Sequence, residues 1–112
     1  MKPIRKGKEI DWHTFDKCHD GVGVLQFKSL LDDCDPQVIR FMHNDEIKAG
    51  VSIGVHSHAN DEEIYYLVSG KGILTYDDEE YDMEAGDISF CNKGHSHGFF
   101  ATEDSVLIVV GC

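Results

Sequence analysis

The segment from Gly50 to Gly70 decides the fold, and its sequence is GVSIGVHSHANDEEIYYLVSG. Its first half alternates apolar and small or polar residues up to His56 and His58, which is typical of a β-strand. Side chains two residues apart on a strand point to the same face, so the two imidazoles lie about 7 Å apart on one face. The Ala-Asn-Asp turn that follows lets a second strand, starting near Glu63, return beside the first. A carboxylate from that strand can therefore approach the two histidines.

A second segment repeats this arrangement. After Gly86, strand-like residues end in the turn Asn92-Lys-Gly, and histidines follow at His95 and His97. Imidazole and carboxylate ligands together suit a first-row divalent transition metal. On an octahedral metal, three histidines and one carboxylate leave two cis positions for water, substrate or dioxygen. The sequence therefore predicts a metal site, while the residues alone leave open which glutamate and which later histidine complete it.

Short strand-like runs separated by turn residues fill the rest of the chain. We predict strands at residues 24–30, 38–42, 51–58, 64–68, 73–76, 87–91, 98–101 and 106–110. We predict a turn at residues 43–46, a solvated hairpin tip at 77–80, and at most one short helical turn within 32–40. Because no long stretch has a 3.6-residue apolar period, the pattern favours an antiparallel sandwich or small barrel.

The composition excludes several classes of function. The chain has 112 residues, enough for one domain with one core. Its 21 acidic residues against 10 Lys and Arg give a net charge of -11, which argues against nucleic acid and anionic membrane as partners. No signal peptide or transmembrane run is visible, so we expect a cytoplasmic protein. The cysteines are then expected to be free thiols, and they are Cys18, Cys34, Cys91 and Cys112.

The two histidine segments resemble the motifs of the cupin superfamily over residues 50–101. The first motif, G-x5-H-x-H-x3,4-E-x6-G, matches Gly50, His56, His58, Glu63 and Gly70. The second, G-x5-P-x-G-x2-H-x3-N, matches Gly86, Gly94 and His97, with Asn92 in place of proline and Ala101 in place of asparagine. Neither departure removes a ligating atom. The short gap between the motifs is similar to that of small single-domain microbial cupins.

This resemblance implies an all-β fold, the double-stranded β-helix, which is a jelly-roll-like barrel. Residues 1–112 would form a single cupin domain, with 1–21 as an N-terminal arm or strand and 22–112 as the barrel. One divalent transition metal (Mn, Fe, Ni, Co or Zn) would be held by His56, His58, Glu63 and His97. Glu62 and His95 are the alternative ligands, but the motif spacing favours Glu63 and His97.

Two classes of function fit these expectations, and both need a small-molecule ligand. The first is a metal-dependent enzyme, either an isomerase or epimerase of small hydroxy-carbonyl compounds or a dioxygenase. Tyr65 and His95 are its candidate catalytic residues, for proton transfer. The second is a non-catalytic module that binds or senses a sugar-like molecule. Small cupins usually form homodimers, and the apolar residues before Val22 could cover a partner's sheet edge.

Strand alternation extends the predicted wall around the metal. The residues that share a face with the ligands are Ser52, Gly54, Tyr65, Leu67 and Phe99. Arg40 and Gln26 lie on earlier strands whose inward face the sequence leaves open; an inward Arg40 would favour an anionic substrate, and an apolar cavity a hydrophobic or aromatic one. We assign no chemistry to four residues in turn-like or N-terminal segments, Trp12, His13, His19 and His43.

Overall fold

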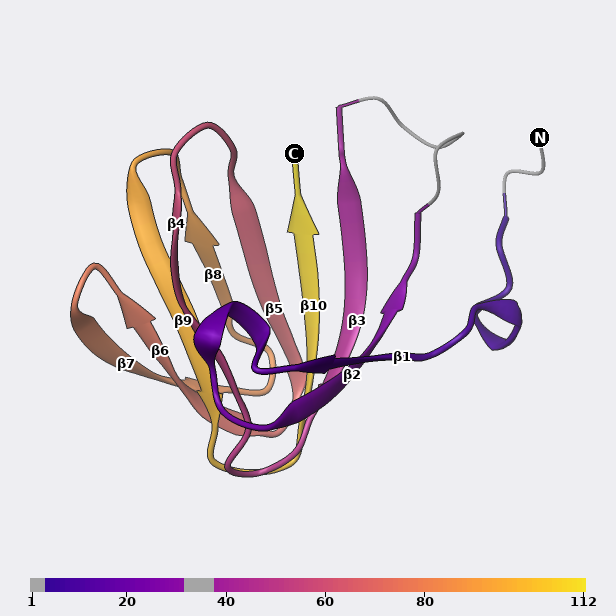
Figure 1. Ribbon diagram of the computed structural model, residues 1–112, viewed down its shortest axis with the longest axis horizontal. Coiled ribbons are helices and arrows are strands. Elements are labelled where there is room, and N and C mark those ends of the chain that lie inside the picture. Colours follow the sequence, from indigo (N-terminus) through magenta and orange to yellow (C-terminus); the bar gives the residue numbers. More distant parts are fainter. Residues whose placement is uncertain (1–3, 32–37) are drawn as a thin grey trace.

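The computed structural model describes residues 4–31 and 38–112, which form two antiparallel β-sheets that face each other (Figure 1). The strands are β1 (His13–Asp16), β2 (Val24–Ser29), β3 (Phe41–Ile47), β4 (Ser52–His58), β5 (Glu63–Ser69), β6 (Lys71–Tyr76), β7 (Glu79–Glu84), β8 (Ile88–Cys91), β9 (His95–Ala101) and β10 (Ser105–Gly111). The six-stranded sheet has the order β1-β2-β3-β10-β5-β8, and the four-stranded sheet has the order β4-β9-β6-β7. The 3-10 helices η1 (Gly7–Glu9) and η2 (Cys18–Asp20) flank β1. The prediction of an all-β barrel-like fold is confirmed.

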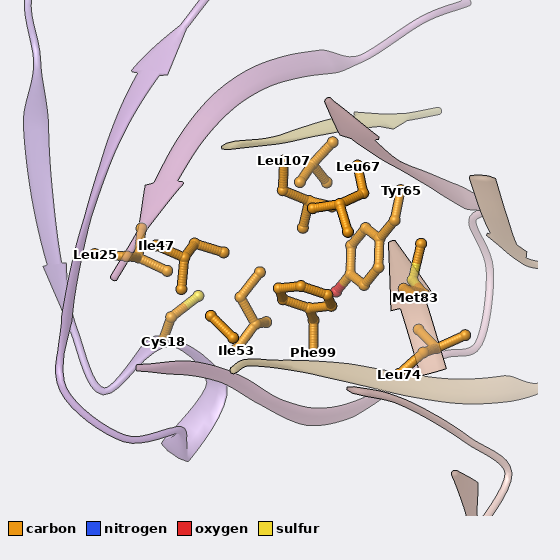
Figure 2. Close-up of a cluster of buried hydrophobic side chains, with 12 residues drawn as sticks. Cys18, Leu25, Ile47, Ile53, Tyr65, Leu67, Leu74, Met83, Phe99 and Leu107 are labelled. Atoms are coloured by element: carbon orange, nitrogen blue, oxygen red, sulfur yellow. The ribbon is translucent and has the colours of Figure 1, made fainter. Parts of the chain in front are cut away.

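The core lies between the two sheets (Figure 2). Alternate residues of the strands point inward, as in β10, where Leu107 and Val109 are buried and their neighbours are half-buried. The largest core side chains, each at most 6% exposed, are Leu25, Ile47, Ile53, Tyr65, Leu67, Leu74, Met83, Phe99 and Leu107. Each such burial stabilises the fold by roughly 1.5–3 kcal/mol. The two sheets are therefore held face to face by one continuous apolar cluster.

Strand β3 differs from its prediction. It runs from Phe41 to Ile47, so the strand predicted at 38–42 is displaced and the turn predicted at 43–46 is wrong. The polar residues there are typical of a turn, yet in the structure they belong to a strand that pairs with both β2 and β10. His43 and Asp45 face inward beside a cavity, which explains polar residues in the middle of a strand.

The strand pattern of the sequence did not predict the edge strands β1 and β7, although residues 1–21 were expected to form an arm or a strand. The turn at the predicted hairpin tip consists of Asp77 and Asp78 alone, with φ of 47° and 70°. Positive φ at both central residues matches the twist of tight hairpins. The four residues of β1 are all exposed, and in β7 only Met83 is buried. Strands exposed on both faces lack the apolar alternation by which a strand is recognised in sequence.

The N-terminal segment is part of the sheet, since β1 pairs with β2 of the same chain. The helical turn predicted at 32–40 falls largely on residues outside those described, as does Cys34. Cys18, Cys91 and Cys112 are free thiols, as predicted. Within the described ranges, no helix has the length and apolar character needed to cross a membrane.

Candidate metal centre

Three strands bring four possible metal ligands together. β4 carries His56 and His58, β5 begins at Glu63, and β9 carries His97, which lies directly opposite His56 in the ladder. One ligand atom from each side chain lies within 4.8 Å of all the others. The carboxylate oxygens of Glu63 are 3.0 Å from Nε2 of His97, 3.8 Å from Nε2 of His56 and 3.6 Å from Nε2 of His58. The four residues named by the motif spacing therefore converge on one point.

A β-bulge in β4 decides which side chains face this point. Ile53 and His56 are three residues apart, yet they pair with β9 residues that are only two apart. One extra residue in a strand reverses the inward and outward alternation beyond it. Ile53 therefore lines the cavity, whereas Ser52 and Gly54, which strict alternation placed on the wall, do not. That part of the predicted wall is wrong.

Contacts on the far side of the rings orient the histidines. His56 donates from Nδ1 to the carbonyl of Gly54 at 2.8 Å, and His58 donates from Nδ1 to the carboxylate of Asp61 at 3.0 Å. Each contact places the ring proton on Nδ1 and turns Nε2 toward the other ligands. The ring of His97 is stacked on Tyr65, with 4.1 Å between centroids. The imidazoles are thus held in position by groups that are not themselves ligands.

Burial and neighbouring groups shift the pKa values of three ligands in different directions. Burial acts to lower the pKa of His56, but its contacts with Glu63 and Gly54 outweigh burial and raise that pKa. Burial acts to raise the pKa of Glu63, but the neighbouring imidazoles of His56 and His97 outweigh it and lower that pKa to about 2. Burial lowers the pKa of His97, because the opposing effect of Glu63 is smaller. An ionised carboxylate and neutral imidazole are the species that coordinate a metal.

The donor set fits a divalent transition metal. Nε2 of His56 is buried without a hydrogen-bond partner. Nε2 of His58, whose ring proton is on Nδ1, lies 3.1 Å from Nε2 of His97, and Nε2 of His97 also lies 3.0 Å from a carboxylate oxygen of Glu63. A metal ion would satisfy these three nitrogens together with the carboxylate. Nitrogen and oxygen donors suit Mn, Fe, Ni, Co and Zn alike, so the ligands do not single out one metal.

The ligand cluster opens into a cavity of about 270 Å³. Its wall comes from β1, β2, β3 and η2 as well as from β4 and β5, so the N-terminal segment helps to enclose it. Most of the wall is apolar, including Phe15, Phe27 and Phe41. Lys and Arg are absent from the described residues that line it.

Tyr65 and His95, the two candidate catalytic residues, lie in different places. Tyr65 is fully buried and lines the cavity, and its hydroxyl has no hydrogen-bond partner. Burial raises the pKa of this phenol well above 10, so it stays protonated. Nδ1 of His95 contacts the carboxylate of Asp77, and its ring is stacked on Tyr76. His95 is not among the described residues that line the cavity, so the structure does not bring it to the site.

The remaining sequence candidates lie away from the cavity or in the core. Arg40 is exposed and does not line the cavity, so it offers no anchor there for an anionic substrate. Gln26 and Glu62 are also exposed, whereas Glu63 is buried among the histidines. Leu67 and Phe99 are core residues.

Five residues of the cavity that carry a polar or thiol group had no role in the sequence analysis, namely Cys18, His19, His43, Asp45 and Asp61. The ring of His19 is stacked on His56 with only 3.6 Å between centroids. His43 and Asp45 alternate with outward residues along β3, so a correct strand boundary would have placed both inward. No local signal exists for Cys18 or His19, because η2 reaches the site from a distant part of the sequence.

Comparison with known proteins agrees with this fold and site. A family model described as the cupin domain matches residues 45–111. The chain belongs to the cupin domain family. It is 26% identical over 105 residues to an oxalate-binding protein of Thermotoga maritima, covering 93% of this chain and 87% of that protein. This cupin is also similar to solved structures that have the jelly-roll fold.

Two solved structures illustrate the range of cupins with this shape. The crystal structure of a predicted oxalate decarboxylase from Thermotoga maritima superposes with a TM-score of 0.91 at 25% identity, covering 96% of each chain. A sugar phosphate isomerase of the cupin superfamily from Silicibacter pomeroyi superposes with a TM-score of 0.80, covering 97% of this chain and 74% of that one. At 19% identity, the second likeness concerns the fold alone.

Proposed function

We propose that this cupin is a metal-dependent enzyme acting on a small oxygen-bearing metabolite, with one divalent transition metal on His56, His58, Glu63 and His97. The observation that carries the proposal is the convergence of these four ligands, within 4.8 Å, beside a cavity of about 270 Å³. When bound, the metal would supply Lewis acidity toward a substrate oxygen. An isomerase or epimerase and a dioxygenase are two reaction types that this donor set permits.

The chain's own residues would position the ligands and the substrate. Gly54 and Asp61 fix the rings of His56 and His58 through Nδ1. Tyr65 is the candidate proton donor of the wall, since its buried hydroxyl has no protein partner. His95 has no contact with the cavity that would support a catalytic role.

A non-catalytic binding module is the second candidate, for a sugar-like or other small ligand. Its support is the relative named an oxalate-binding protein, which is similar over most of both chains. In that case the metal would hold the ligand and no bond would change.

Metal content tests whether the four proposed ligands bind a transition metal. Protein purified without chelator or added metal is expected to contain close to one transition-metal ion per chain by elemental analysis. His97→Ala is expected to lose most of this metal, because a buried ligand is removed, whereas His95→Ala, two residues away on the same strand, is expected to keep it. Equal metal in His97→Ala and the wild type would contradict the ligand assignment.

Turnover separates the two candidates. The metal-loaded protein would be incubated with hydroxy-carbonyl compounds and with oxalate, in air and without oxygen, and products followed by mass spectrometry and NMR. Conversion that disappears in His97→Ala and persists in His95→Ala supports an enzyme. A ligand that binds in a metal-dependent way and is recovered unchanged supports the binding module.

We also propose a cytoplasmic homodimer. The free thiols of Cys18, Cys91 and Cys112 suit a reducing compartment. Support for the dimer comes from the outer face of the six-stranded sheet, where β5 and β8 expose apolar side chains. β1 pairs within its own chain, so the proposal rests on this face and not on an exchanged arm.

A further inference from the structure

Asp45 is a buried carboxyl group that faces the cavity and that the metal site does not use. It is 4% exposed, and its Oδ1 has no hydrogen-bond partner. It lies in the middle of β3, between Phe27 of β2 and Leu107 of β10 in the ladder. A buried carboxyl oxygen without a hydrogen-bond partner destabilises a fold, so its place here needs another explanation.

Aromatic side chains lie beside Asp45 on the same side of the sheet. Phe27 and Phe41 flank the ring of His43, at centroid distances of 5.1 Å and 5.3 Å. Phe15 extends this group toward solvent, at 6.3 Å from Phe27. We call these four residues the aromatic wall. Its rings offer flat apolar surface to a ligand with an aromatic or similarly apolar body.

The charges around the cavity disfavour a compact dianion. Besides Asp45, the described lining residues include the carboxylates of Asp61 and Glu63, and neither Lys nor Arg is among them. A ligand with two negative charges would therefore meet no Lys or Arg side chain on the described part of this wall. A hydroxyl group, in contrast, can donate a hydrogen bond to a carboxylate or accept one from a carboxylic acid.

We propose that Asp45 binds a hydroxyl group of the ligand, and that the ligand is a small hydroxylated compound whose apolar body packs on the aromatic wall. This inference rests on the proposed function, because another oxygen of the same ligand would face the metal. Burial, and then the charge of Glu63, raises the pKa of Asp45 to about 7, so either protonation state is accessible near neutral pH. Asp45 is thus the second polar contact that fixes the ligand's orientation.

Binding of benzoate and its three monohydroxylated isomers tests the proposal. Calorimetric titrations would use metal-loaded protein, with the metal content of every sample measured. At least one hydroxybenzoate is expected to bind the wild type about tenfold more tightly than benzoate, as a buried charge-assisted hydrogen bond allows. In Asp45→Leu the hydroxybenzoate is expected to bind about as tightly as benzoate. Glu46 is the outward-facing neighbour on β3, and Glu46→Gln is expected to keep the preference of the wild type.

The outcomes of this titration separate the role of Asp45, the class of ligand and the proposed function. A preference that survives in Asp45→Leu, or that no isomer shows, overturns the role of Asp45. Failure of every panel member to bind the metal-loaded protein overturns the ligand class. Samples that hold no metal, or binding unchanged after metal removal, count against the proposed function itself. If Asp45→Leu does not fold, Asp45→Asn replaces it, and a preference as large as in the wild type again contradicts the proposal.

Discussion

The hydrogen bond between His58 and Asp61 shows how a single residue prepares the candidate metal site. Asp61 accepts from Nδ1 at 3.0 Å and thereby leaves Nε2 of His58 facing Glu63. We expect Asp61→Asn to weaken metal binding by roughly 10- to 100-fold, because the ring loses its fixed orientation and basicity. Competition with a chromophoric chelator measures this. Glu62→Gln, which removes the adjacent exposed carboxylate, is the control, and a larger loss in that variant would show that the wrong glutamate has been assigned.

Asp45 makes the stability of the metal-free protein depend on pH. Burial, then the charge of Glu63, raises its pKa from 3.8 to about 7, so folding favours the protonated acid. Relative to Asp45→Asn, the wild type therefore loses stability as the pH rises from about 4 to about 7, by on the order of 4 kcal/mol in full. Urea unfolding of both proteins in chelator, at about pH 4 and about pH 8, measures the difference. A difference that does not change with pH would refute the burial of a titrating Asp45.

The ligands could be predicted at the residue scale, whereas the rest of the cavity could not. His56 and His58 follow from their spacing on one strand, whereas the choice of Glu63 over Glu62 and of His97 over His95 came from the resemblance to the cupin motifs. Asp45 lies on a strand whose polar residues favoured a turn prediction, because the polarity serves the cavity and not solvent. Residues that contact a site from distant strands leave no spacing to recognise.

At the scale of the element, η2 and the bulge of β4 fit closely together. η2 and the residue before it contain three non-glycine residues with positive φ, namely Lys17, His19 and Asp20, at 53°, 50° and 61°. Such conformations cost energy and persist where packing holds them. His19 is held by its ring stacking on His56 and by its backbone lying against Gly54.

Gly54→Ala tests whether the contact between η2 and Gly54 contributes to the stability of the fold. A Cβ at Gly54 would lie 1.9 Å from the carbonyl oxygen of His19, so backbone has to move. We expect a loss of about 1–3 kcal/mol in the free energy of unfolding, as for other overpacked positions. Gly7→Ala is the matched control, since its Cβ would have nothing within 4 Å. Urea unfolding compares the two variants, and equal stabilities would mean that η2 shifts away at no cost.

The strand predictions succeeded where one face is buried and failed elsewhere. β5 and β10 alternate buried and more exposed residues along their length, and the sequence shows this directly. β1 and β7 bury almost nothing, so their pairing is set by neighbouring strands and not by their own pattern. The bulge in β4 is likewise invisible in the alternation, and it lies where the backbone of η2 approaches Gly54.

At the scale of the whole molecule, the six-stranded sheet leaves an apolar outer face on β5 and β8. Ile64 pairs with Phe90 and Tyr66 with Ile88, and these four side chains are 40–61% exposed. Contiguous exposed apolar surface of this kind marks protein contacts in soluble proteins. Both strands also lie at one edge of the sheet, away from the aromatic wall of the cavity.

We therefore expect light scattering to give twice the chain mass of 12.6 kDa for the wild type at micromolar concentration. Phe90→Glu is expected to give the monomer mass, because a charge at the centre of the apolar contact would be buried without a partner. Tyr81→Glu places the same charge on another exposed aromatic position, on β7 in the other sheet, and is expected to leave the dimer intact. A monomeric wild type would exclude the dimer altogether. A dimer that persists in Phe90→Glu and dissociates in Tyr81→Glu would move the interface to the four-stranded sheet.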